Sequence, residues 1–126
     1  MSAIKGFNFS KSMYILNITF LCAKEELEER TRMLKEEMLP ALNVAPARRA
    51  TLMILSDVPG SPDFHTHERT LPLQIEFDSK ADRDVWMQMV MMPALEEYQK
   101  ELGERGLVMV SLLDVLERCE REQDGV

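Results

Sequence analysis

The chain has 126 residues, of which 45% are hydrophobic, enough for one domain with a substantial core but too few for two. Lysine and arginine number 15 against 22 aspartates and glutamates, and the net charge of -7 argues against a nucleic acid partner. No apolar run approaches the roughly 20 residues of a transmembrane helix, and the N-terminus lacks a signal-peptide core, so we expect no membrane partner and a cytoplasmic location.

The first half of the chain predicts a strand, a helix and a second strand. Residues 1–12 carry no clear pattern, so we expect a flexible N-terminal extension or, alternatively, a short edge strand. Apolar and polar residues alternate over 13–21, which predicts a strand, and residues 48–56 are typical of another. Between them, 24–39 predicts a helix that Pro40 bends or ends. Its buried positions have helical spacing: Leu27, Arg30 or Thr31, Leu34 and Met38.

The second half repeats this order after residues 57–69, a connection longer than a hairpin needs and therefore a functional, partner-binding or mobile loop. Residues 71–78 alternate as a strand, and Ser79 is the expected N-cap of a helix that Gly103 ends. We expect this helix to bury Val85, Met89, Met92 and either Leu95 or Tyr98.

The end of the chain predicts a fourth strand over 107–112 and then a short acidic helix over 113–121. We therefore expect a single domain over 13–118, followed by a frayed tail over 119–126.

An internal echo links the two halves. The sequence MLPAL at 38–42 returns as MMPAL at 91–95, at matching distances from the preceding strands. Each half is therefore one βαβ unit, and the prolines should kink both helices over the sheet.

Two such units predict an α+β fold, the ferredoxin-like βαββαβ topology, with a four-stranded antiparallel sheet and both helices on one face. We expect the first and third strands to lie in the middle, parallel to each other. The residues predicted under the helices are Tyr14, Leu16, Ile18, Phe20, Leu71, Leu73, Ile75 and Phe77. The open face then carries the candidate ligand-facing or dimer-interface residues Asn17, Thr19, Gln74, Glu76 and Ser111, with Thr51 and Met53 from an edge strand.

Four segments, at 13–19, 36–40, 73–79 and 110–116, resemble a family of small bacterial proteins of unknown function in the dimeric alpha-beta barrel class. The resemblance covers about 13–116 and implies a ferredoxin-like subunit that forms a homodimer. It carries no catalytic residue over to this chain.

The open face mixes apolar and polar groups, so a second subunit would enclose a partly polar cavity with room for a small ligand. Enclosure would raise the pKa of Glu76 and make it a candidate acid or base, with Asn17, Gln74 and Thr19 to orient a substrate. The alternative is a carboxylate hydrogen-bonded within a wet interface. Arg48 and Arg49 are candidate partner charges.

Other candidate groups are few. His65 and His67 in the long loop either begin a metal site or are simply exposed, and we expect no metal and no cofactor. Cys22 and Cys119 lie outside any paired motif, so reduced thiols are expected rather than a disulfide. The methionines at 87, 89, 91 and 92 either fill the core or form a protein-binding patch.

With no catalytic motif in view, we expect a homodimeric binding or interaction module that uses the open sheet face. The alternative is a small cofactor-independent oxygenase- or isomerase-like barrel enzyme, with Glu76 or a loop histidine as the base.

Overall fold

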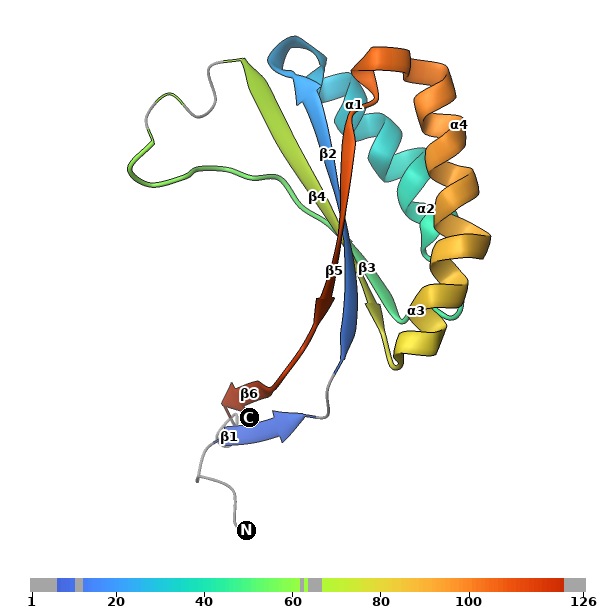
Figure 1. The fold of residues 1–126 in the computed structure, drawn as a ribbon. Coiled ribbons are helices and arrows are strands. Elements are labelled where there is room, and N and C mark those ends of the chain that lie inside the picture. The colour runs from blue at the N-terminus through green and yellow to red at the C-terminus, as the bar shows by residue number, and fades with distance from the viewer. Residues whose placement is uncertain (1–6, 11–12, 62, 64–66, 122–126) are drawn as a thin grey trace.

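The computed structural model describes residues 7–10, 13–61, 63 and 67–121. It consists of a curved four-stranded main sheet with every helix on the same side, and a separate two-stranded sheet of β1 and β6 (Figure 1). The strands are β1 (Phe7–Ser10), β2 (Tyr14–Ala23), β3 (Arg49–Leu52), β4 (Glu68–Phe77), β5 (Val108–Asp114) and β6 (Arg118–Arg121). The helical segments are η1 (Lys24–Glu26), α1 (Leu27–Met33), η2 (Leu34–Met38), α2 (Leu39–Leu42), α3 (Lys80–Trp86), η3 (Met87–Met91), α4 (Met92–Leu102) and η4 (Gly103–Arg105).

The main sheet has the strand order β3-β4-β2-β5, and all its neighbouring strands are antiparallel. This order with two helical crossovers is the predicted ferredoxin-like topology. The prediction that the two central strands are parallel was wrong, because β2 and β4 pair antiparallel from Tyr14 opposite Phe77 to Ala23 opposite Glu68. β2 and β3 run in the same direction without pairing, because β4 lies between them and is antiparallel to both.

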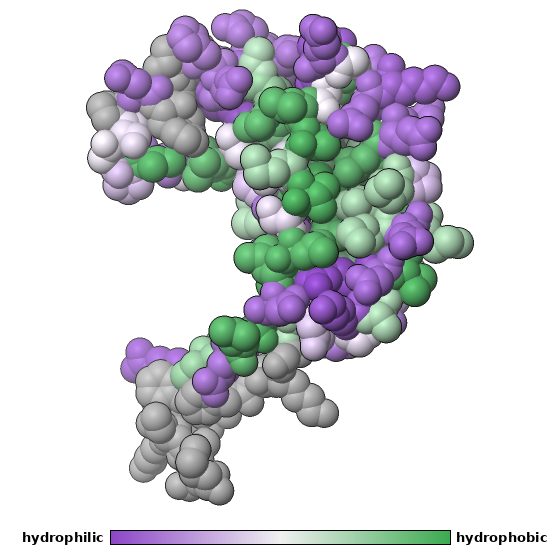
Figure 2. Space-filling view, in the orientation of Figure 1, coloured by the Kyte–Doolittle hydropathy of each residue, from purple (hydrophilic) through white to green (hydrophobic). Residues whose placement is uncertain are grey.

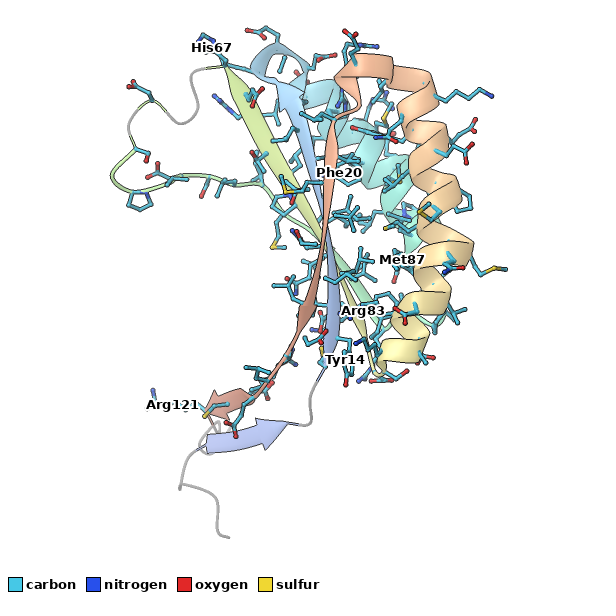
Figure 3. All side chains as sticks on the ribbon, in the orientation of Figure 1. Tyr14, Phe20, His67, Arg83, Met87 and Arg121 are labelled. Carbon is cyan, nitrogen blue, oxygen red and sulfur yellow. The ribbon has the colours of Figure 1, made fainter. Side chains whose placement is uncertain are left out.

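The core lies between the sheet and the helices, and it contains the residues that strand alternation predicted there. Phe20 and Met87 lie in this layer in Figure 3. Aromatic rings join the layers edge to face, with centroids 5.1 Å apart for Phe20 and Tyr98 and 5.3 Å apart for Phe77 and Trp86. The indole nitrogen of Trp86 in α3 donates to the Leu42 carbonyl in α2 at 3.1 Å, and this bond joins the two helices.

The second helix, formed by α3, η3 and α4, buries a different face from the predicted one. Val85, Met89 and Met92 are 56%, 73% and 58% exposed, whereas Trp86 and Met91 are buried. The cause is η3, a π-helical turn in which the N–H of Met92 donates to the carbonyl of Met87. A π turn holds one residue more than an α turn, so it rotates the buried face away from simple α-helical spacing.

The internal echo is present in the structure. Each half contains a five-residue π turn, η2 or η3, that ends two residues before the proline of the repeated sequence. Proline lacks an N–H and crowds the carbonyl four residues earlier, and a wider turn relieves that crowding. Pro40 therefore does not end the first helix, which continues to Leu42.

A buried arginine occupies the same position in each half, four residues before the π turn: Arg30 in α1 and Arg83 in α3. One amino group of Arg83 reaches the Ile15 and Leu113 carbonyls, both at 3.1 Å, and the Asp114 carboxylate at 2.8 Å. The guanidinium also lies over the ring of Tyr14, 5.5 Å from its centroid. Arg83 thus joins α3 to the neighbouring strands β2 and β5.

The end of the chain is extended, so the predicted helix over 113–121 was wrong. β5 continues to Asp114, which Arg83 holds, and the N–H of Val115 donates to the Met13 carbonyl at 2.7 Å. β6 then pairs antiparallel with β1 in a separate two-stranded sheet. This ribbon combines part of the expected extension at 1–12 with residues on both sides of the expected boundary at 118.

The structure also refines the other bounds. β4 begins at Glu68, earlier than expected, and β3 ends at Leu52. Backbone hydrogen bonds from Met53 to Pro72 and from Leu55 to Thr70 nevertheless continue the β3–β4 pairing toward the long loop. None of the helices in the described residues is both long enough and apolar enough to cross a bilayer.

Replacing Arg83 with methionine tests its structural role. We expect the free energy of unfolding to fall by about 2–4 kcal/mol, because two backbone carbonyls and one carboxylate lose their buried donor. Urea denaturation followed by circular dichroism measures this loss. The matched control is Arg32→Met, which removes an exposed ion pair between Arg32 and Glu36. It should lower the free energy of unfolding by at most about 0.5 kcal/mol. Equal losses in the two variants would contradict a structural role for Arg83.

Candidate functional site

On the sheet face opposite the helices, here called the concave face, charged, polar and apolar side chains lie in separate rows. Strand register places its outward side chains in three rows that cross four strands. One row is charged at one end and apolar at the other: Arg49, Glu76, Ile15 and Leu113. The next is wholly polar: Thr51, Gln74, Asn17 and Ser111. The third is largely apolar: Met53, Pro72, Thr19 and Met109.

All five predicted open-face residues therefore lie on the concave face. Four of them are half-buried: Asn17, Thr19, Gln74 and Ser111. The amide of Asn17 donates to the Thr19 hydroxyl at 3.1 Å, so these two side chains are oriented by each other. Glu76 differs from the other four because it is only 6% exposed.

Two arginines lie near the Glu76 carboxylate, one at each oxygen. Arg49 Nε lies 3.9 Å from Oε2, and Arg118 Nη2 lies 3.9 Å from Oε1. Both distances exceed a hydrogen bond, so the charges attract each other without direct contact. Burying a carboxylate is costly, and the two cations offset part of this cost.

A pocket of about 190 Å³ opens at this position, lined by Met13, Arg48, Arg49, Glu76 and Arg118. Arg48 binds Asp78 at 3.0 Å, and its backbone N–H donates to the Glu76 carbonyl at 2.8 Å. Arg118 also approaches the Met13 sulfur at 3.2 Å. The pocket thus brings three guanidinium groups near two carboxylates, a local excess of positive charge on an acidic chain.

The predicted partner charges Arg48 and Arg49 are both present at this site. Arg118 was not among the predicted site residues, because residues 113–121 were predicted to form a helix. An arginine beyond the last predicted strand did not indicate a site by itself. Its place beside Glu76 depends on the pairing of β6 with β1.

The concave face lies between two projections. The described part of the connection between β3 and β4 extends to the side away from the helices, and the β1/β6 ribbon projects on the same side at the other end (Figure 1). Figure 2 shows the hollow between them and hydrophobic side chains gathered over β5. On this face, β5 exposes the apolar side chains of Met109 and Leu113. The shape and the apolar edge together suit a binding surface.

The loop histidines do not form a described site. His65 lies outside the described residues, and His67 is exposed at the start of β4, where its carbonyl accepts from the Lys24 N–H at 3.0 Å (Figure 3). Among the described residues, no group of three or more histidine, cysteine or acidic side chains is arranged to hold a metal ion.

The two cysteines differ in environment and both are free thiols. Cys22 is buried on the helix side of β2, and Cys119 is exposed in β6. Burial raises the pKa of the Cys22 thiol above its ordinary value of 9.0, and the positive charge of Arg30 only partly opposes this increase.

Comparisons with known proteins identify the fold. No protein-family model matches the chain, and no curated protein does. The chain is similar to a crystal structure from Bacillus cereus described as an antibiotic biosynthesis monooxygenase, with a TM-score of 0.52 and 12% sequence identity. The alignment covers 84% of this chain and 95% of that one. This likeness confirms the predicted ferredoxin-like fold of the chain.

The thiols provide a test of the environment of β2. We expect Ellman's reagent to modify Cys119 quickly and Cys22 slowly, because Cys22 is buried and has a raised pKa. Absorbance should therefore rise in two phases in the native protein and in one fast phase in denaturant. Cys119→Ser should remove the fast phase. Loss of the fast phase in Cys22→Ser would show instead that β2 is accessible.

Proposed function

We propose that the chain forms a homodimer through the concave face and acts as a binding module for a small anion, without catalysis. The observation that carries this proposal is the pair of 3.9 Å separations around Glu76, one to Arg49 and one to Arg118. Both guanidinium groups line the pocket without a hydrogen bond to Glu76, so they have N–H donors available for a bound anion.

Dimerisation is supported by the composition of the concave face. Met109 and Leu113 are 58% and 50% exposed in the single subunit, and both lie on β5 at one edge of this face. Burying them against the same surface of a second copy removes apolar area from water and forms an isologous interface. The polar row through Asn17 and Gln74 would then face its own copy, where direct or water-mediated hydrogen bonds would satisfy it.

A carboxylate or phosphate group suits the pocket beside Glu76. Arginine binds both groups through paired N–H donors, and Arg49 and Arg118 come from different elements, so they approach a guest from two sides. Glu76 would set the position of both guanidiniums before the ligand arrives. A second subunit over the concave face would reduce the access of water to this pocket and strengthen the attraction.

A second candidate function is a cofactor-independent oxygenase with Glu76 as the base. Its support is the likeness of fold to the Bacillus cereus protein, together with the buried position of Glu76. Such an enzyme would consume oxygen with a substrate that becomes electron-rich on deprotonation. Oxygen uptake that Glu76→Gln abolishes, while the variant remains dimeric, would favour this function over the binding module.

Replacing Met109 with glutamate tests the interface. Each subunit of an isologous dimer would carry the new carboxylate into the apolar contact, and we expect the dimer to dissociate at least about 100-fold more readily. Sedimentation velocity across a concentration series measures this change. The matched control, Met89→Glu, alters a 73% exposed side chain on the outer helix and should leave the dimer unchanged. A monomeric wild-type protein would refute the proposed interface.

Native mass spectrometry of the purified protein tests the ligand. We expect a dimer that retains added inorganic phosphate or citrate, and about tenfold weaker retention in Arg118→Gln, because one charged hydrogen-bond donor is lost. The control is Arg121→Gln, which changes an arginine at the other end of β6, labelled in Figure 3. A dimer without retained anion, or equal effects of the two substitutions, would contradict the anion site.

A further inference from the structure

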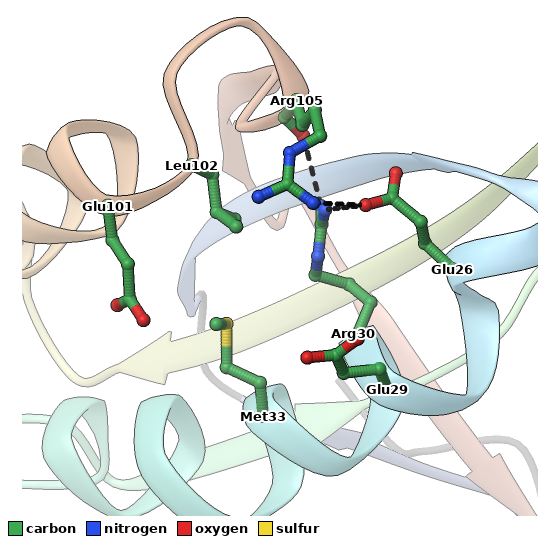
Figure 4. A pocket seen from close by; sticks show the side chains of 7 residues that line it. All are labelled: Glu26, Glu29, Arg30, Met33, Glu101, Leu102 and Arg105. Carbon is green, nitrogen blue, oxygen red and sulfur yellow. Dashed lines mark hydrogen bonds and ion pairs between the residues drawn. The ribbon is translucent and has the colours of Figure 1, made fainter.

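A second pocket lies on the helix side of the molecule, between the start of the first helix (η1 and α1) and the end of the second (α4 and η4). Its volume is about 280 Å³ (Figure 4). The lining side chains come from η1, α1, α4 and η4: Glu26, Glu29, Arg30, Met33, Glu101, Leu102 and Arg105. Since the helices cover the opposite face of the sheet, this pocket is separate from the concave face.

Arg30 forms the inner wall and is 3% exposed. Its Nη1 donates to the Tyr98 hydroxyl at 2.8 Å and to the Arg105 carbonyl at 3.1 Å. The guanidinium also lies 5.7 Å from the centroid of the Tyr98 ring. These contacts fix the plane of the guanidinium before any ligand binds.

The other terminal nitrogen of Arg30 is less well satisfied. Nη2 lies 3.6 Å from Glu26 Oε1, which is beyond hydrogen-bonding distance. The same oxygen accepts from Arg105 Nη1 at 2.7 Å, so the shorter bond of Glu26 goes to Arg105. A buried guanidinium with an incompletely bonded edge beside a cavity favours an acceptor oxygen there.

The outer walls have the opposite charge. Glu29 and Glu101 both line the pocket, and neither forms an ion pair with another residue in the described part of the chain. Met33 and Leu102 supply an apolar surface between the charged groups in Figure 4. The pocket thus places both guanidiniums, with Glu26 and Glu29, on one side and the Glu101 carboxylate on the other, with a hydrophobic surface between them.

The backbone after α4 is shaped to hold Arg105 in this position. Gly103 has φ of +59°, a conformation that side chains other than glycine rarely adopt. A Cβ on Gly106 would lie 3.2 Å from the Leu102 Cβ, so this turn packs closely on the helix. The Gly106 N–H donates to the Gly103 carbonyl at 3.0 Å and closes the turn.

We propose that this pocket binds a small amphipathic zwitterion of the class of an apolar α-amino acid. The carboxylate would lie against Arg30 and Arg105, the ammonium against Glu29 or Glu101, and the side chain on Met33 and Leu102. A lone anion would leave the two glutamates without a cation, and a lone amine would leave the Arg30 edge without an acceptor. A zwitterion satisfies both walls at once.

The test uses three amino acids, L-leucine, L-methionine and L-phenylalanine, with two analogues of leucine. Isopentylamine lacks the carboxylate and 4-methylpentanoate lacks the ammonium. Titrations followed by amide chemical shifts should show saturable binding of at least one amino acid, with the shifts confined to residues 26–33 and 98–106. We expect each analogue to bind about tenfold more weakly than leucine, because each loses one charged contact.

Variants at exposed positions separate ligand recognition from folding. Glu101→Gln and Arg105→Gln should each weaken amino acid binding by about tenfold. Their controls, Glu97→Gln on α4 and Arg32→Gln on α1, change exposed residues outside the lining of this pocket and should leave binding unchanged. Absence of saturable shifts with all three amino acids would overturn the proposal, as would equal binding of leucine and isopentylamine.

Discussion

The pairing of β2 with β4 is the constraint on which the rest of the structure depends. Both strands have ten residues and they pair along their whole length, so a slip of one residue would exchange the core face for the concave face. If β4 slipped on β2, Ile75 would meet water and Glu76 would enter the core. The cost of both changes fixes a single register, and that register places Glu76 at the candidate anion site.

Strand alternation was sufficient to predict this part of the fold from the sequence. Period two assigns each side chain to a face without knowledge of its neighbours, which is why Asn17, Gln74 and Glu76 were placed correctly. Helix faces were predicted less well, because the π turn before Pro93 changes the spacing within the helix. The methionines at 89 and 92 therefore face outward, although simple α-helical spacing places them in the core.

The charged parts of the two pockets depend on contacts between distant parts of the chain. Arg118 reaches Glu76 only because β6 pairs with β1, and no local pattern encodes that pairing. Arg30 did give a local signal, since it occupies a position in the first helix where an apolar residue is expected. Its partner Tyr98 lies in the other half of the chain, so the sequence indicated an unusual position but did not predict the hydrogen bond.

The two buried arginines also connect the repeated halves in a reciprocal way. Arg30 belongs to the first half and donates to Tyr98 and Arg105 of the second, while Arg83 of the second half donates to Ile15 of the first. Together with the β2–β4 pairing, these bonds couple the halves through side chains and strands rather than through the loop that joins them. The halves consequently form one cooperative unit, and the joining loop is free to vary in length and sequence without loosening it.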